Sequence, residues 1–69
     1  MSVEIKLLDV VAVTEDIAGH KLRRGQVGTI VEVLGPDAFM VEFVDNNGRT
    51  YATLSLRSNQ LMVLHHQSA

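Results

Sequence analysis

Hydrophobic and polar positions alternate along most of this chain with a period of two, which is the period of a β-strand. The alternation predicts strands over residues 8–14, 27–34, 38–45 and 49–56, and a short apolar run predicts a fifth strand over 61–64. No apolar stripe with helical spacing runs through these segments. We therefore expect an all-β fold.

The two faces of each strand predict which side chains form the core. In the strand over 27–34, Thr29 shares one face with the valines, and Glu32 lies on the other face. A glutamate is expected to face water, so we predict that Val27, Val31 and Val33 pack inside, and the side taken by Ile30 stays open. The inward sets of the next two strands are Phe39, Val41 and Phe43, and then Ala52, Leu54 and Leu56.

Residues that favour tight turns separate the strands. Gly35 opens the sequence Gly-Pro-Asp, in which proline presets φ and the flanking residues tolerate tight geometry. Asn47 and Gly48 form an Asn-Gly pair between two β-rich runs, and both residues accept positive φ cheaply, so we predict a hairpin. Residues 57–60 are expected to form one 3₁₀-like turn before the last strand.

A polar stretch, TEDIAGHKLRRGQ, joins the first two strands at residues 14–26. A loop of this length in a small domain is usually compact and carries its own apolar anchors. Ile17 and Leu22 are isolated apolar residues in it, and we expect them to tuck beneath the loop.

Five short strands, a long first loop, two hairpins and a 3₁₀ turn predict a small SH3-like barrel. Curling the sheet buries one face and hides most strand edges, which a flat sheet of this size could not do. The 69 residues form a single domain, with an ordered core over about 5–64 and a frayed tail over 65–69.

Composition narrows the environment and the partners. The chain has no cysteine, so disulfides and thiolate zinc sites are excluded and a reducing cytoplasm fits. We expect no signal peptide, because the first residues carry acidic groups and no basic region, and no membrane span, because no apolar run approaches about 20 residues. A core this small supplies only about 3–5 kcal/mol, so a partner protein or a second copy is a plausible source of stability.

Residues 24–33, RGQVGTIVEV, resemble the KOW motif of ribosomal and transcription-associated SH3-like barrels, in which two glycines frame an apolar residue. Gly25 would allow a sharp exit from the long loop, and Gly28 would let a neighbouring strand pass close. The resemblance implies RNA binding through basic residues as an alternative function.

A longer resemblance covers almost the whole chain. The segments LLDVVA, LRRGQVGTIVE, VEF, GRTY and QL lie at residues 7–12, 22–32, 41–43, 48–51 and 60–61. With these segments the chain is similar to a family of small, mostly bacterial and cyanobacterial proteins classed as a domain of unknown function. The family implies no assigned activity. Some members stand beside short toxin-like genes, which implies neutralising a partner protein as one role.

The basic cluster in the long loop is one candidate binding site. Lys21, Arg23 and Arg24 stand close together in a chain of formal charge −2. They could meet an acidic protein partner or the phosphates of RNA. They could equally form a solvated loop in which an arginine pairs with Glu15 or Asp16.

Outward apolar positions are the second candidate site. Met40, Tyr51 and Met62 lie on the outward parity of their strands, as does Val10, and such residues often mark a contact surface. Self-association, or pairing of an exposed strand edge with a partner strand, is the leading hypothesis. We expect a non-enzymatic protein-interaction module.

Catalytic and metal sites have little support in the sequence. The serines have no histidine neighbour outside the tail, so no nucleophilic triad is expected. His65 and His66 are adjacent, and adjacent side chains in an extended segment point apart, so convergence on one metal with His20 is not expected. We expect no cofactor.

Overall fold

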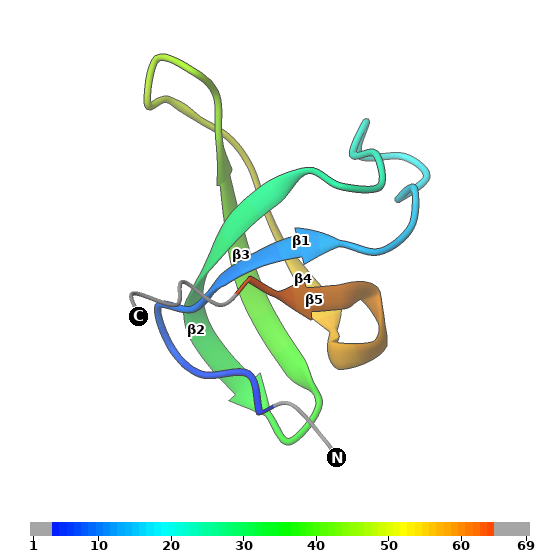
Figure 1. Cartoon of the computed structure of the whole chain (residues 1–69), viewed down its shortest axis with the longest axis vertical. Coiled ribbons are helices and arrows are strands. Elements are labelled where there is room, and N and C mark those ends of the chain that lie inside the picture. The colour runs from blue at the N-terminus through cyan, green and yellow to red at the C-terminus, as the bar shows by residue number, and fades with distance from the viewer. Residues whose placement is uncertain (1–3, 65–69) are drawn as a thin grey trace.

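The computed structural model describes residues 4–64, which form five antiparallel strands and one 3₁₀ helix (Figure 1). The elements are β1 (Val10–Val13), β2 (Val27–Gly35), β3 (Ala38–Val44), β4 (Thr50–Arg57), η1 (Ser58–Gln60) and β5 (Leu61–Val63). The all-β class, the five strands and the 3₁₀ turn before the last strand are confirmed.

The strands form one sheet in the order β4-β3-β2-β1-β5. Strands β2, β3 and β4 follow one another through two hairpins, and β5 returns to pair with β1. The sheet curls, so that β1 and β5 pass over β3 and β4 in Figure 1. Over residues 4–64 the hydrogen-bonded ladder does not close on itself, and β4 and β5 are its two edges. The expectation that closure hides most edges is therefore wrong in one respect: two edges remain.

The core is built from the inner face of the curled sheet and one loop residue. Its buried members are Val11, Val13, Leu22, Ile30, Phe39, Val41, Phe43, Leu56 and Leu61. The predicted inward set of β3 is confirmed, because Phe39, Val41 and Phe43 are all buried. Ala52 and Leu54 pack against the core but are only half-buried, because β4 is an edge strand.

The prediction for β2 is wrong, because its valines are not part of the buried core. Ile30 is completely buried, whereas Val27, Val31 and Val33 are 48%, 38% and 48% exposed. Pairing with β3 explains this result, because Ile30 lies opposite the buried Val41 and must share its face. The register then shifts by one residue at Val31, so that the strand continues beyond a β-bulge.

Gly28 has the close-approach role that the sequence predicts. A Cβ atom placed there would lie 2.7 Å from Val41 Cγ1 and 2.9 Å from both the Glu42 carbonyl oxygen and Phe43 Cδ1. Strand β3 therefore passes over the bare backbone of Gly28. Gly25 has a φ of +94°, which fits the predicted sharp exit from the long loop.

The hairpin between β3 and β4 is confirmed, but its geometry differs from the expected one. Only Gly48 has positive φ, at +80°. The Gly48 N–H donates to the Asp45 carbonyl at 3.0 Å, and the Asp45 N–H donates to the Arg49 carbonyl at 2.8 Å. This is a three-residue loop that ends in a left-handed glycine. Asp45 Oδ1 accepts from the Asn47 and Arg49 N–H groups, so Asn47 stays in ordinary backbone space.

The long loop is compact, as predicted. Ile17 and Leu22 form an isolated antiparallel bridge, with the Ile17 N–H donating to the Leu22 carbonyl at 2.9 Å. Leu22 is 1% exposed and belongs to the core, and Ile17 packs against that core. The anchors therefore fold the loop back on itself.

Strand β1 begins at Val10 and not at residue 8, because a tight turn precedes it. The Asp9 carboxylate accepts the Lys6 N–H, and the Asp9 N–H donates back to the Lys6 carbonyl. Leu8 has a φ of +71° in this turn and is 69% exposed. A leucine in this region of backbone space is held there by its surroundings, here by its N–H bond to the Ile30 carbonyl.

Candidate functional site: a groove along β5

Three hollows share lining residues, and we refer to them together as the β5 groove, after the strand that lines the middle one. The first is lined by Glu4, Ile5, Val33, Gly35, Pro36, Phe39 and Ser58. The second is lined by Ile5, Thr14, Ser58, Asn59, Leu61, Met62 and Val63. The third is lined by Thr14, Glu15, Asp16, Arg23 and Arg24. Shared residues join them, because Ile5 and Ser58 border the first two and Thr14 borders the last two.

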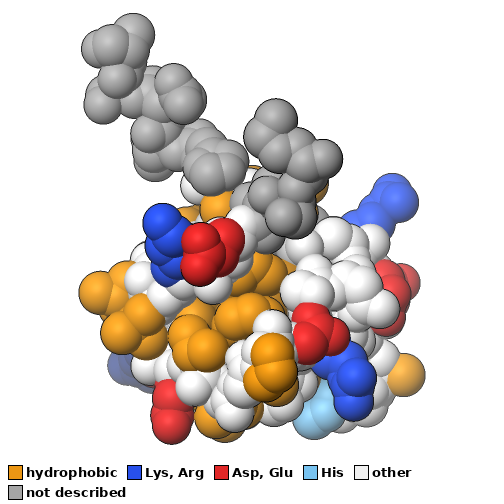
Figure 2. Space-filling view, turned by 90° about the horizontal axis from the view of Figure 1, so that it is seen from below, with side chains coloured by type: hydrophobic (Ala, Val, Ile, Leu, Met, Phe, Trp, Pro, Cys, Tyr) orange, Lys and Arg blue, Asp and Glu red, His pale blue; other side chains and the backbone are white. Residues whose placement is uncertain are grey.

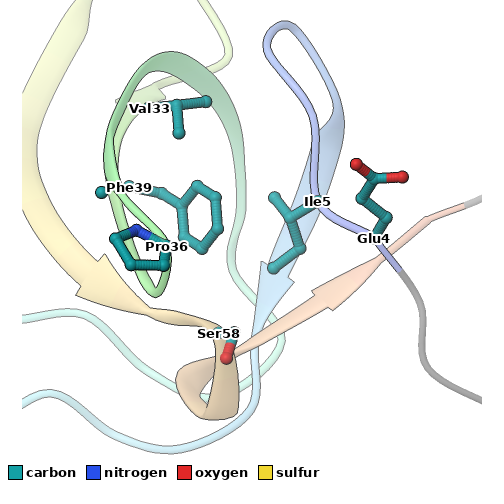
Figure 3. Close-up of a pocket in the computed structure, with 7 residues that line it drawn as sticks. Glu4, Ile5, Val33, Pro36, Phe39 and Ser58 are labelled. Carbon is teal, nitrogen blue, oxygen red and sulfur yellow. The ribbon is translucent and has the colours of Figure 1, made fainter.

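The first hollow lies between the β2–β3 hairpin, the N-terminal segment and η1. Figure 3 shows the Phe39 ring and Ile5 facing each other across it, with Ser58 below them. Val33 reaches this side of β2 because it is paired with Phe39 beyond the bulge. Figure 2 views the molecule from this end and shows hydrophobic side chains gathered in the middle of the face.

One polar tether holds the hairpin to η1. The Asp37 carboxylate accepts the hydroxyl of Ser58 and also the Ser58 backbone N–H, the latter at 3.2 Å. The Ser58 hydroxyl, then the Ser58 N–H, lowers the pKa of Asp37 below its ordinary value, with a smaller contribution from the positive charge of Arg57. The charged form of Asp37 is therefore the one that the folded chain favours.

The second hollow follows the outer edge of β5 and has a volume of about 470 Å³. Leu61 is buried beneath it, and Met62 is 54% exposed beside it. The Leu61 N–H donates to the Ser58 carbonyl in η1. The Thr14 hydroxyl donates to the Asn59 carbonyl at 3.2 Å, which fixes the end of β1 to η1. The floor of the groove is thus held on both sides.

The third hollow is charged and lies in the long loop. Asp16 Oδ1 accepts the backbone N–H of Arg24 at 2.9 Å, and Gln26 Oε1 accepts the backbone N–H of Arg23. Both arginines are exposed. Asp16 is one of the two carboxylates predicted to pair with an arginine side chain. In the structure it instead accepts the backbone N–H of Arg24, and this hydrogen bond orders the loop.

The structure brings three of the six predicted binding residues into the β5 groove and leaves three elsewhere. Arg23, Arg24 and Met62 line it. Lys21 is exposed elsewhere in the long loop, with a φ of +58°. Met40 is half-buried on β3, the strand next to the opposite edge of the sheet.

Tyr51 lies on β4 and Met62 on β5, which are the two edge strands of the sheet, and Tyr51 lines none of the three hollows. The Tyr51 hydroxyl oxygen accepts a hydrogen bond from Gln26 Nε2 at 3.0 Å. The Tyr51 ring centroid lies 6.4 Å from that of the buried Phe43. Tyr51 therefore braces the start of β2 against β4. The predicted outward set does not form one continuous patch.

Sequence reasoning missed Ile5 and Ser58, which each border two hollows. Ile5 precedes the first expected strand, so no periodicity marks it. Ser58 resembles an ordinary turn serine until Asp37, 21 positions away, is placed beside it by the fold. The positions of both residues in the groove depend on contacts between segments that lie far apart in the sequence, and these contacts appear only in the folded chain.

Over residues 4–64, no group of three histidine, cysteine, aspartate or glutamate side chains could hold a metal ion. His65 and His66, considered above as metal ligands, lie outside the described residues. In the same part of the chain, no helix has the length and hydrophobicity needed to cross a membrane.

Comparison with curated proteins and with solved structures found no match. The model of one protein family does match, over residues 7–63, from the turn before β1 to the last residue of β5. That match includes all five strands and the long loop. The chain therefore belongs to the family described as Domain of unknown function (DUF4926).

Proposed function

We propose that this chain is a non-enzymatic protein-interaction module that binds an extended apolar segment of a partner protein in the β5 groove. The observation that carries the proposal is the continuity of the groove. It passes from the Phe39 hollow, along the exposed side of Met62, to the two arginines of the long loop. Extended segments are recognised in this way, by alternate side chains that enter successive pockets.

The apolar part of the groove supports a peptide ligand in preference to a small polar one. Ile5 and Val63 are half-buried and pack against the core, so they present fixed apolar surface. Met62 adds a flexible thioether side chain, which adapts to ligands of different shape. Burying an apolar side chain of the partner here contributes about 25 cal/mol per Å² of surface removed from water.

The charged end of the groove favours an acidic group on the partner. Asp16 already accepts a backbone N–H, whereas Arg23 and Arg24 direct exposed guanidinium groups outward. RNA is the less favoured ligand, because Glu15 and Asp16 stand in the same hollow and offset the positive charge that phosphates require. Neutralising a partner protein, the role implied by family resemblance, is one use of such a groove.

Selection from a library of random peptides displayed on phage tests the proposal. We expect peptides with apolar residues at alternate positions and an acidic residue toward one end. Met62→Glu should weaken their binding at least tenfold. Val44→Glu is the matched control, because Val44 lies on β3 away from the groove and is 46% exposed, and it should leave binding unchanged.

Three results would count against the groove. One is a selection that yields no peptide, and another is a peptide whose binding shifts the amide resonances of β4 instead of β5. The third is salt-sensitive binding of single-stranded RNA in place of peptides, which would favour the nucleic-acid alternative.

A further inference from the structure

We infer that two copies of this chain associate by pairing their β4 strands edge to edge, which extends each sheet into the other. This surface is separate from the β5 groove, because no residue of β4 lines any of the three hollows. The inference therefore goes beyond the proposed function and does not depend on it.

The backbone of β4 has unpaired groups on its outer side. The Ile30 N–H and carbonyl bond to Asp9 and Leu8, so Ile30 turns both groups away from β3. Its partner Val41 must then direct its own groups toward β4, where Leu54 is opposite. Alternation along the strand leaves Thr53 and Ser55 with their N–H and carbonyl groups facing outward.

The same alternation is visible at the end of the strand. Arg57 has the parity of Ser55, and its N–H is taken by Gln60 Oε1 at 2.9 Å, from outside the sheet. Within residues 4–64, no further strand pairs with β4 on that side. The open section is therefore centred on Thr53 and Ser55.

This section carries none of the devices that usually protect an edge. Residues 50–56, TYATLSL, contain no charge, no proline and no glycine, and the one register shift against β3 lies at the beginning of the strand. Natural edges are protected by lysines, prolines, bulges or short length. An uncharged edge of this kind is suited to a second strand.

A two-fold axis through Leu54 gives the self-pairing that fits the side chains best. Thr53 of each copy then lies opposite Ser55 of the other on the outer face, and the two Leu54 side chains meet on the inner face. Hydroxyl pairs of this kind are favourable across strands, and about four hydrogen bonds form between the copies.

The charges select the same register. A shift that centres the axis on Thr53 would place Arg49 opposite Arg57, and like charges directly opposite are destabilising. The axis through Leu54 avoids that contact. It also brings Arg57 toward Glu42 of the other copy. Their Cα atoms would lie about 12 Å apart, a distance that the two long side chains can span. Glu42 and Thr53 are cross-strand neighbours, so the Glu42 carboxylate lies on the same face of the sheet as Thr53 and Arg57.

The burial of the inner face supports pairing as well. Ala52 and Leu54 pack against the core yet stay half-buried in the single chain. A second β4 strand would cover the part of these side chains that solvent now reaches. An interface of one strand pair is small, so we expect a dissociation constant of about 10 μM or weaker.

Sedimentation equilibrium from about 10 μM to 1 mM, combined with the Thr53→Pro variant, tests the inference. The proline removes an N–H that has no partner among residues 4–64, so the monomer should fold while dimerisation is lost. Thr53→Val is the matched control, because it keeps the backbone N–H and should keep the dimer. Ser55→Lys, a charged edge substitution that leaves the backbone unaltered, should also give a monomer.

Amide resonances of Thr53 and Ser55 should shift with protein concentration, and those of Met62 and Val63 should not. Strictly monomeric protein at 1 mM would overturn the inference. A dimer that survives both Thr53→Pro and Ser55→Lys would also overturn it. Both outcomes leave peptide binding in the β5 groove untested by this experiment, so failure of the dimer is distinguishable from failure of the proposed function.

Discussion

The two edges of the sheet are exposed in different ways. The β5 edge has three residues, its first N–H is taken by the Ser58 carbonyl, and η1 and Ile5 border it. The β4 edge has eight residues, and in the described part of the chain only its last N–H is taken from outside the sheet. The two edges therefore offer different groups to a partner, namely backbone groups along β4 and side chains along β5.

This difference suggests a division of labour between two surfaces of one small sheet. Along β5, little backbone is available, but side chains line a groove, so a partner is bound mainly by its side chains. Along the middle of β4, Thr53 and Ser55 present small hydroxyls, and the backbone itself is the recognisable feature. Strand addition suits the second edge better than the first.

Proline substitution along β4 offers the largest test of this comparison. Leu54→Pro should cost about 3 kcal/mol or more beyond Leu54→Ala, because the Leu54 N–H bonds to β3. A domain of this size has about 3–5 kcal/mol in total, so Leu54→Pro should be largely unfolded at 25 °C. Urea denaturation followed by circular dichroism measures both variants.

Thr53→Pro is the neighbouring control, and its loss should be much smaller because the Thr53 N–H faces outward. If Leu54→Pro and Thr53→Pro destabilise the chain equally, the assignment of open backbone groups on β4 is wrong.

Both edges depend on the rigidity of the sheet centre, which Gly28→Ala tests. A Cβ at Gly28 would lie 2.9 Å from the Glu42 carbonyl oxygen and closer still to a Val41 methyl, so strand β3 must move. We expect a loss of about 1–3 kcal/mol in the free energy of unfolding. Gly35→Ala is the control, because nothing lies within 4 Å of its added methyl group and no loss above about 0.5 kcal/mol is expected. Thermal denaturation of both variants measures their losses of stability, and equal losses would contradict this prediction.

A smaller effect, dependent on pH, is expected at the Asp37 tether beside the β5 groove. The pKa of Asp37 is lowered in the folded chain by Ser58, so the unfolded chain takes up the proton first as pH falls. The charged Asp37 carboxylate therefore stabilises the folded chain above pH about 4, and this stabilisation is lost as pH falls through the lowered pKa of Asp37. Asp37→Asn should therefore lower the melting temperature at pH 7 and have little effect near pH 2. A constant difference across that range would show that the carboxylate charge is not responsible.

The smallest effect on stability is expected from Met62→Glu. Met62 is 54% exposed, so the substitution should change the free energy of unfolding by no more than about 0.5 kcal/mol. Chemical denaturation alongside the peptide-binding assay measures both quantities. Lost binding with unchanged stability would sharpen the contrast between the edges, whereas a large loss of stability would show that Met62 is part of the core.

Much of the fold follows from local signals in the sequence. The alternation of Phe39, Val41 and Phe43 places β3, and the glycine at 48 places the hairpin. The faces of β2 could not be read in the same way, because Ile30 and the valines are all apolar and only pairing with Val41 decides between them. The candidate site was least accessible to prediction, since Ile5 and Ser58 acquire their positions from contacts between distant segments.

The bulge at Val31 has a consequence for how chains of this family can vary in length. Before it, the even-numbered residues of β2 point inward; after it, Val33 shares the side of Phe39. Deleting Val31 would restore strict alternation and leave Glu32 opposite Met40 and Val33 opposite Phe39. Relatives can therefore lose this one residue without turning any side chain of β2 to the other face, in the same way that the long loop can change its length without inverting a strand.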